Sequence, residues 1–126
     1  MYRTMLRAKI HRASVTAVEV DYEGSCGIDR DLLDAAGVLG FEQVDVYNVT
    51  NGQRLTTYAI PLPAGSGRIT LNGAAAHRAA FGDLVIICAY GLLAESEAQG
   101  HRPAVVHVDG ANRVRECRPE QVPAPA

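Results

Sequence analysis

The dipeptide Asn51-Gly52 constrains the fold of this chain more than any other feature. It separates two strand-like runs, residues 44–50 and 53–60. Asn and Gly tolerate a positive φ at little cost, so the pattern predicts a β-hairpin closed by a type I′ turn. Pro61 and Pro63 are expected to end the second strand, because proline cannot donate to a sheet ladder.

Short strand-like segments fill most of the remaining chain. They are expected at residues 4–22 (with a bend), 68–71, 84–90, 105–108 and 113–117, and short helices are expected at about 29–36 and 94–98. Asp29 or Asp31 could cap the first helix at its start, and Gly37 suits the left-handed position after it. This pattern predicts an all-β fold, a β-barrel with a few short helices. Residues 1–126 are read as one domain with a flexible tail at about 119–126.

Composition excludes several classes of protein. With 126 residues, 48% hydrophobic and 21% charged, the chain can bury a core and is not a disordered or disulfide-dense scaffold. A net charge of −2 and only 6% aromatic residues argue against nucleic-acid binding. The longest apolar run, residues 84–94, is too short to span a membrane.

The cysteines and the N-terminus indicate a cytoplasmic protein. Cys26, Cys88 and Cys117 have no paired spacing, which suits a reducing compartment and predicts no zinc site. Cys88 lies in an apolar run and is expected in the core. The N-terminus lacks the apolar segment of a signal peptide. The histidines have no metal-ligand spacing, so no metal is expected.

Charge is unevenly distributed along the first 45 residues. Residues 1–18 carry four cations and no acid, whereas residues 19–45 carry eight acids and one arginine. Two interpretations stay open. The segments pair within the fold or between subunits, or some of the N-terminal cations line a pocket for an anionic ligand.

The dipeptide Gly24-Ser25 is a candidate reactive site. A Gly-Ser pair is usually a plain surface turn. Alternatively the peptide bond is strained, and the serine hydroxyl attacks the preceding carbonyl, because glycine has no side chain to block approach. A serine hydrolase could also be assembled from Ser25, His11 and an aspartate, but no Gly-x-Ser-x-Gly motif surrounds the serine. Lys9 is the only lysine, so a Schiff base on a protein amine would have to use it.

A series of motifs then resembles one family. They are residues 3–6 (Arg-Thr-Met-Leu), 9–12 (Lys-Ile-His-Arg), 22–25 (Tyr-Glu-Gly-Ser), 28–29 (Ile-Asp), 33–36 (Leu-Asp-Ala-Ala), 51–54 (Asn-Gly-Gln-Arg), 57–60 (Thr-Tyr-Ala-Ile), 65–66 (Gly-Ser), 72–77 (Asn-Gly-Ala-Ala-Ala-His) and 82–83 (Gly-Asp). In order and spacing the chain resembles the pyruvoyl-dependent aspartate 1-decarboxylases of pantothenate biosynthesis, from Met1 to about Val106.

The resemblance implies a fold, a cofactor and partners. The fold would be a double-psi β-barrel, assembled as a homotetramer with sites between subunits, and some members need a helper protein for maturation. The chain would cleave itself between Gly24 and Ser25 into a β chain 1–24 and an α chain 25–126. Ser25 would become a covalent pyruvoyl group, which makes the catalytic carbonyl without using Lys9.

The resemblance also implies a reaction and roles for residues. L-aspartate would form a Schiff base with the pyruvoyl group, lose carbon dioxide and give β-alanine. Tyr58 would be the proton donor, while Arg54 and Lys9 would bind substrate carboxylates. Further substrate contacts are expected from Thr57, which is also implicated in cleavage, and from Asn72, Gly73, Ala74 and Ala75. His11 is expected near the site in an auxiliary role.

Two other functions compete with this interpretation. The barrel could be a binding or regulatory module that never cleaves, in which case intact chains would persist with any maturation partner. It could be a serine hydrolase, in which case a fluorophosphonate probe would label Ser25.

Overall fold

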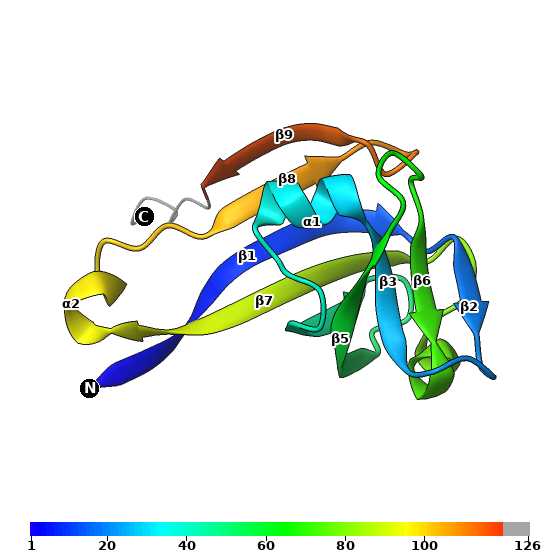
Figure 1. The fold of residues 1–126 in the computed structure, drawn as a ribbon, viewed down its shortest axis with the longest axis horizontal. Helices are drawn as coiled ribbons and strands as arrows, with labels where there is room; N and C mark the ends of the chain where they lie inside the picture. The colour runs from blue at the N-terminus through cyan, green and yellow to red at the C-terminus, as the bar shows by residue number, and fades with distance from the viewer. Residues whose placement is uncertain (120–126) are drawn as a thin grey trace.

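A computed structural model describes residues 1–119 of the chain. Within them nine strands form one mixed sheet in the order β2-β6-β3-β5-β4-β7-β1-β8-β9 (Figure 1). The strands are β1 (Tyr2–Ser14), β2 (Ala17–Glu19), β3 (Ser25–Asp29), β4 (Gln43–Asn48), β5 (Arg54–Leu62), β6 (Ile69–Asn72), β7 (Leu84–Ala94), β8 (Ala104–Val108) and β9 (Val114–Pro119), and the helices are α1 (Arg30–Ala36), the 3₁₀ helix η1 (Gly73–Arg78) and α2 (Glu95–Ala98). The all-β prediction is confirmed.

The sheet combines antiparallel and parallel neighbours. The long strands β1 and β7 run antiparallel side by side, and β8 lies parallel to β1 (Figure 1). At one end of the molecule β2 pairs parallel with β6, and β3 pairs parallel with β5. This strongly bent mixed sheet agrees with the double-psi barrel that the family resemblance implies.

The first helix follows its sequence signals closely. The Asp29 side chain accepts a hydrogen bond from the Asp31 N–H, and Gly37 ends the helix in the left-handed conformation at φ 71°. Leu32 and Leu33 are buried against the sheet, with Ala36 beside them. Of the two candidate N-caps, Asp29 and Asp31, it is Asp29 that caps the helix, and the predicted position of Gly37 is confirmed. The apolar face of the helix closes one side of the core.

The prediction of a type I′ turn at Asn51-Gly52 is wrong. That turn needs a positive φ at both residues, but only Gly52 has one, at 78°. β4 already ends at Asn48, whose side-chain carbonyl accepts from the N–H groups of Thr50 and Asn51. The Asn48 side chain therefore shapes a longer loop, in which glycine supplies the single left-handed residue.

Other element boundaries differ from the predictions in smaller ways. The bent segment 4–22 is two strands, separated at residues 15–16, and Pro61 lies inside β5 rather than ending it. Cys88 is buried, as predicted. Of the expected tail, Pro119 is the last residue of β9, and residues 120–126 lie outside the described part of the chain.

The charged segments pair partly with each other. The Arg7 guanidinium forms an ion pair with Glu42 and also donates to the Gly37 carbonyl, 2.9 Å away. Arg3 instead pairs with Glu95, at 2.7 Å, which lies outside the acidic segment. Both arginines therefore pair within the fold, but only the Arg7 pair joins the basic segment to the acidic one.

Asn112 joins three segments that are distant in sequence. It is 1% exposed and has a φ of 61°. Its side-chain carbonyl accepts from the Ser14 N–H at 2.8 Å, and its amide donates to the carbonyls of Ser14 and Gly67, both at 2.9 Å. Buried main-chain groups therefore depend on one side chain for their hydrogen bonds.

We expect Asn112→Ala to lower the free energy of unfolding by about 3 kcal/mol, because it leaves buried polar groups unsatisfied. The matched control is Asn51→Ala, whose exposed amide also donates to a main-chain carbonyl, that of Arg78 at 3.0 Å. Water can replace that partner, so the control should lose less than about 1 kcal/mol. Urea denaturation measures the free energy of unfolding of both variants. Equal losses would show that the buried hydrogen bonds of Asn112 contribute no more than the exposed one of Asn51.

Within residues 1–119, no helix is long and apolar enough to cross a membrane. The same residues contain no group of three or more His, Cys, Asp or Glu side chains arranged to hold a metal ion.

Candidate active site

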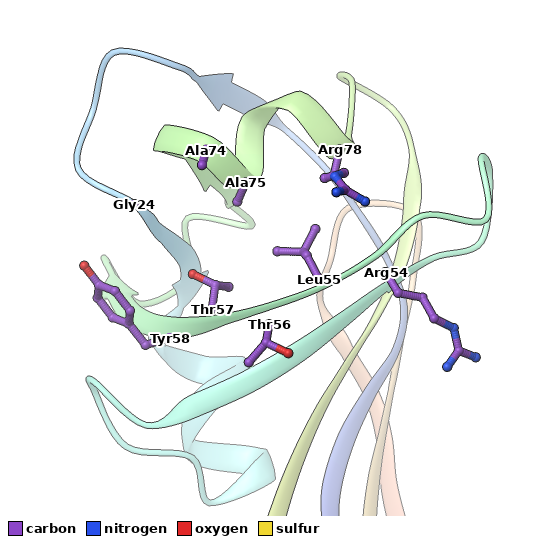
Figure 2. A pocket seen from close by; sticks show the side chains of 9 residues that line it. All are labelled: Gly24, Arg54, Leu55, Thr56, Thr57, Tyr58, Ala74, Ala75 and Arg78. Atoms are coloured by element: carbon purple, nitrogen blue, oxygen red, sulfur yellow. The ribbon is translucent and has the colours of Figure 1, made fainter.

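A pocket of about 450 Å³ lies between β5 and η1 (Figure 2). It exists because β5 pairs with β3 only from Ala59 onward, whereas residues 54–58 pair only with β4 in the described sheet. The other edge of residues 54–58 therefore faces η1 across an open space. The lining residues are Gly24, Arg54, Leu55, Thr56, Thr57, Tyr58, Ala74, Ala75 and Arg78.

Ser25 directly follows Gly24 in the chain and is the first residue of β3. It is 3% exposed, and its Oγ lies 2.9 Å from the side-chain nitrogen of Asn72, its partner on β6. The second N–H of that amide points to Thr70 Oγ1 at 3.4 Å. Two acceptors thus fix the Asn72 amide with its nitrogen toward Ser25, and the amide holds the serine hydroxyl beside the Gly24 peptide.

The first residue of η1 touches the chain at Gly24. Gly73 has a φ of 64°, and a Cβ added there would lie 2.7 Å from Gly24 Cα and 2.9 Å from the Tyr22 carbonyl oxygen. Only glycine permits this approach, because it has no Cβ and adopts the left-handed conformation readily. Gly73 therefore sets the position of Gly24 relative to Asn72 and η1.

Thr57 and Tyr58 border the part of the pocket near Gly24. Their hydroxyl groups point toward the segment that carries Gly24 (Figure 2). The Tyr58 ring lies 6.4 Å from the ring of Phe41, tilted by 33°. That contact holds the ring at the rim, since offset aromatic pairs at this distance attract each other. On the facing wall, Ala74 and Ala75 present only methyl groups.

Arg54 lies at the other end of the same strand segment. Its guanidinium stacks over the Tyr47 ring, 4.4 Å from the ring centroid, and points away from Gly24 (Figure 2). Arg54 and Tyr58 are four positions apart, which places their Cα atoms about 13 Å apart at roughly 3.3 Å per strand residue. Arg54 therefore lines the pocket without facing Ser25.

Lys9 and His11 do not line this pocket. Lys9 on β1 is in register with Cys88 on β7 and Val105 on β8. The His11 ring lies 5.4 Å from the His107 ring and borders a separate pocket of about 290 Å³. Lys9 and His11 are the two predicted site residues that lie elsewhere. The chain brings the other predicted residues together at or beside the pocket: Gly24, Ser25, Arg54, Thr57, Tyr58, Asn72, Gly73, Ala74 and Ala75.

Cys26, next to the Gly24-Ser25 peptide, does not compete with Ser25 as a nucleophile. Complete burial raises the pKa of the Cys26 thiol to about 12. The thiol therefore stays protonated at neutral pH, and the reactive thiolate is absent. Of these two side chains, Ser25 and Cys26, the Ser25 hydroxyl is therefore the candidate nucleophile for the Gly24 carbonyl carbon.

A hydrolase triad does not form around Ser25. Within residues 1–119 the recorded partners of its Oγ are the Asn72 amide and the Glu23 carbonyl, the latter at 3.4 Å, and no histidine is among them. His11, the base considered from the sequence, packs against His107 on another face. The serine lacks the general base that this chemistry requires.

Three lining residues were not predicted from sequence: Leu55, Thr56 and Arg78. A signal for each was present. Leu55 and Thr56 lie between two motifs that were assigned to the site, and Arg78 directly follows the motif at residues 72–77.

Comparison with known proteins points to one family. The sequence model of a family described as Aspartate decarboxylase matches residues 1–115, which extends beyond Val106. The chain is 61% identical to the Aspartate 1-decarboxylase of Bordetella avium, over 94% of this chain and 97% of that one. It is 55% identical to the Aspartate 1-decarboxylase of Leptothrix cholodnii, over 95% and 92% of the two chains. That of Thioalkalivibrio sulfidiphilus is 56% identical over 90% of each.

Proposed function

The chain belongs to the aspartate decarboxylase family, and from that premise we propose that it converts L-aspartate to β-alanine and carbon dioxide. β-Alanine made in this way supplies pantothenate and coenzyme A biosynthesis. One observation carries the proposal. The buried Ser25 Oγ accepts a hydrogen bond from the Asn72 side-chain amide at 2.9 Å, and Ser25 directly follows Gly24, which lines the pocket. We further propose that the catalytic carbonyl is a pyruvoyl group made from Ser25.

Self-cleavage at Gly24-Ser25 would begin with attack of Ser25 Oγ on the Gly24 carbonyl carbon. The C–N bond breaks as the C–O bond forms, so an ester replaces the amide and the nitrogen of Ser25 becomes a free amine. Loss of the Ser25 Cα proton then expels the Gly24 carboxylate and leaves dehydroalanine. Addition of water releases ammonia and leaves a pyruvoyl group on the chain 25–126, with the chain 1–24 as the other product.

The surroundings of Ser25 fit such a group. The position is enclosed, with Ser25 3% and Asn72 6% exposed, and the Asn72 amide is a donor aimed at the Ser25 oxygen. The absence of a Cβ at Gly73 keeps the main chain within van der Waals reach of Gly24. A pyruvoyl group supplies an electron sink for the electron pair left when the α-carboxylate departs. Asn72 and the main chain at Gly73 would hold it.

The residues that line the pocket suit the remaining steps. The Tyr58 phenol can donate a proton to the former α-carbon, and the Thr57 hydroxyl can donate to the oxyanion of the cleavage step. Ala74 and Ala75 have small side chains, so their main-chain N–H groups can approach a substrate carboxylate. Arg54 supplies a cationic fork of the kind that binds carboxylates.

A second subunit would bring Lys9 and His11 to this site. Both lie on β1, outside the pocket lining. We therefore propose that these side chains meet the pocket of a neighbouring chain in a homotetramer. A cytoplasmic location and a helper protein for maturation belong to the same proposal. The unpaired state of the three cysteines suits a reducing compartment.

Two measurements test the function. The denatured mass of purified protein should show two fragments split between residues 24 and 25, with the larger one lighter by ammonia than a chain that begins with serine. The cleaved protein should then release carbon dioxide from L-aspartate and form β-alanine. Fully cleaved protein that releases none would refute the substrate. Intact chains that persist after incubation with cell extract would favour a binding module.

We expect Tyr58→Phe to cleave completely but to lower kcat by about 100-fold or more, because it removes only the donated proton. The phenylalanine ring keeps the contact with Phe41. The control is Tyr2→Phe, an exposed tyrosine at the start of β1, which should keep full activity. Turnover by Tyr58→Phe within about twofold of the unmodified enzyme would remove Tyr58 from the proton-donor role.

A further inference from the structure

Arg78 is the one side chain of the pocket lining whose charge has no role in the proposal above. It is the last residue of η1 and projects over the pocket opposite Leu55 (Figure 2). It is exposed, yet it is held in place. Its Nη1 donates to Gln53 Oε1 at 2.7 Å.

The main chain of Arg78 is anchored as well. Its carbonyl accepts hydrogen bonds from the side-chain amides of Asn48 and Asn51, at 3.1 and 3.0 Å. The end of β4, at Asn48, and the loop that follows it, with Asn51 and Gln53, thus hold both the main-chain carbonyl and the guanidinium of Arg78. A long, mobile side chain loses entropy when it is ordered, and these contacts meet part of that cost before any ligand binds.

The charge of the pocket lining is one-sided. Its members include two arginines and no carboxylate. Arg54 is engaged with the Tyr47 ring and points away from Gly24, so Arg78 is the cation that projects over the pocket itself. Cations lining a cleft raise the local concentration of an anion and its rate of arrival.

Resting on the proposed function, we propose that Arg78 is a specificity-determining residue that draws the substrate into the pocket by attracting one of its two carboxylates. η1 advances about 2 Å per residue, so Arg78 begins about 10 Å from Gly73. At that distance it acts on binding of the substrate and not on the bonds that break. It selects ligands with two carboxylates over ligands with one.

Kinetics of Arg78→Gln and Arg78→Lys test this inference. At an ionic strength of about 20 mM we expect Arg78→Gln to raise KM by about 3- to 10-fold with kcat unchanged, and Arg78→Lys to restore most of the affinity. Near 300 mM the difference should shrink, because salt screens the charge. The control is Arg102→Gln, an exposed arginine outside the pocket lining, which should leave KM unchanged.

Calorimetric titration of the cleaved protein with succinate, a dianion that is not decarboxylated here, tests the same charge without turnover. Arg78→Gln should weaken succinate binding by a similar factor and weaken propionate binding less, because propionate carries one negative charge and succinate two. An unchanged KM at low ionic strength together with unchanged succinate binding would overturn the role of Arg78 while leaving the decarboxylase intact. Cleaved protein that binds succinate through Arg78 but never releases carbon dioxide would instead overturn the proposed function.

Discussion

Ser25→Ala is expected to leave a single intact chain of 13.4 kDa that releases no carbon dioxide from L-aspartate. Alanine has no oxygen to attack the Gly24 carbonyl, so neither the cut nor the pyruvoyl group can form. The substitution adds no volume at a site that is 3% exposed, so the fold should survive. Denatured mass after prolonged warming measures the cut, and product assay measures the activity.

The chain supplies a matched control for this result. Gly65-Ser66 is its second Gly-Ser pair, and the Ser66 hydroxyl accepts from the Arg68 N–H at 3.3 Å. Ser66→Ala should cleave between residues 24 and 25 like the unmodified chain. If Ser25→Ala still produced two fragments at that position, the serine would not be the nucleophile.

The second large effect is expected at Gly73. Gly73→Ala should lower the free energy of unfolding by about 3 kcal/mol or more and should also slow cleavage strongly. The new Cβ meets main-chain atoms of Gly24 at 2.7 and 2.8 Å, and main chain cannot rotate away as the end of a side chain can. The shift that relieves the clash must therefore move the peptide that is cut.

Two other glycines separate the causes of this loss. Gly52 has a φ of 78° and no atom within 4 Å of an added Cβ, so Gly52→Ala measures the cost of the left-handed conformation, about 1 kcal/mol. Gly100 has neither constraint, so Gly100→Ala should have almost no effect. Urea denaturation and the rate of fragment formation are compared for the three variants. A Gly73→Ala variant as stable as Gly52→Ala would show that the contact with Gly24 is not tight.

Local signals in the sequence predicted the local structure well. The caps of α1 are residues that act on their own helix: Gly37 is where the pattern placed it, and Asp29 is one of the two aspartates that the pattern offered as the N-cap. The hairpin at Asn51-Gly52 was predicted, but its turn type was wrong, because the Asn48 side chain takes over the hydrogen bonds of the loop. A propensity for one turn does not include a competing side chain three residues away.

The assembly of the site could not be derived from local pattern. Residues 24–25, 54–58 and 72–78 meet only because β3 pairs with β6 on one side and with the far half of β5 on the other. That register is set by the packing of the whole sheet, and a periodicity of two cannot specify it. The motifs that resembled a family named most of the site residues, but they gave no reason for Arg78, whose position depends on the Asn48 and Gln53 side chains.

The location of β1 gives the proposed cut an unusual consequence. β1 lies between β7 and β8 in the interior of the sheet, yet cleavage would assign it to the 24-residue fragment. The mature protein would then be a noncovalent complex of two peptides, held together by the longest strand pairing in the molecule. Folding would be unimolecular before the cut and bimolecular afterwards, so the midpoint of unfolding would come to depend on protein concentration. Maturation would thus convert a chain that can refold by itself into two peptides that, once unfolded, must bind each other again before the fold can re-form.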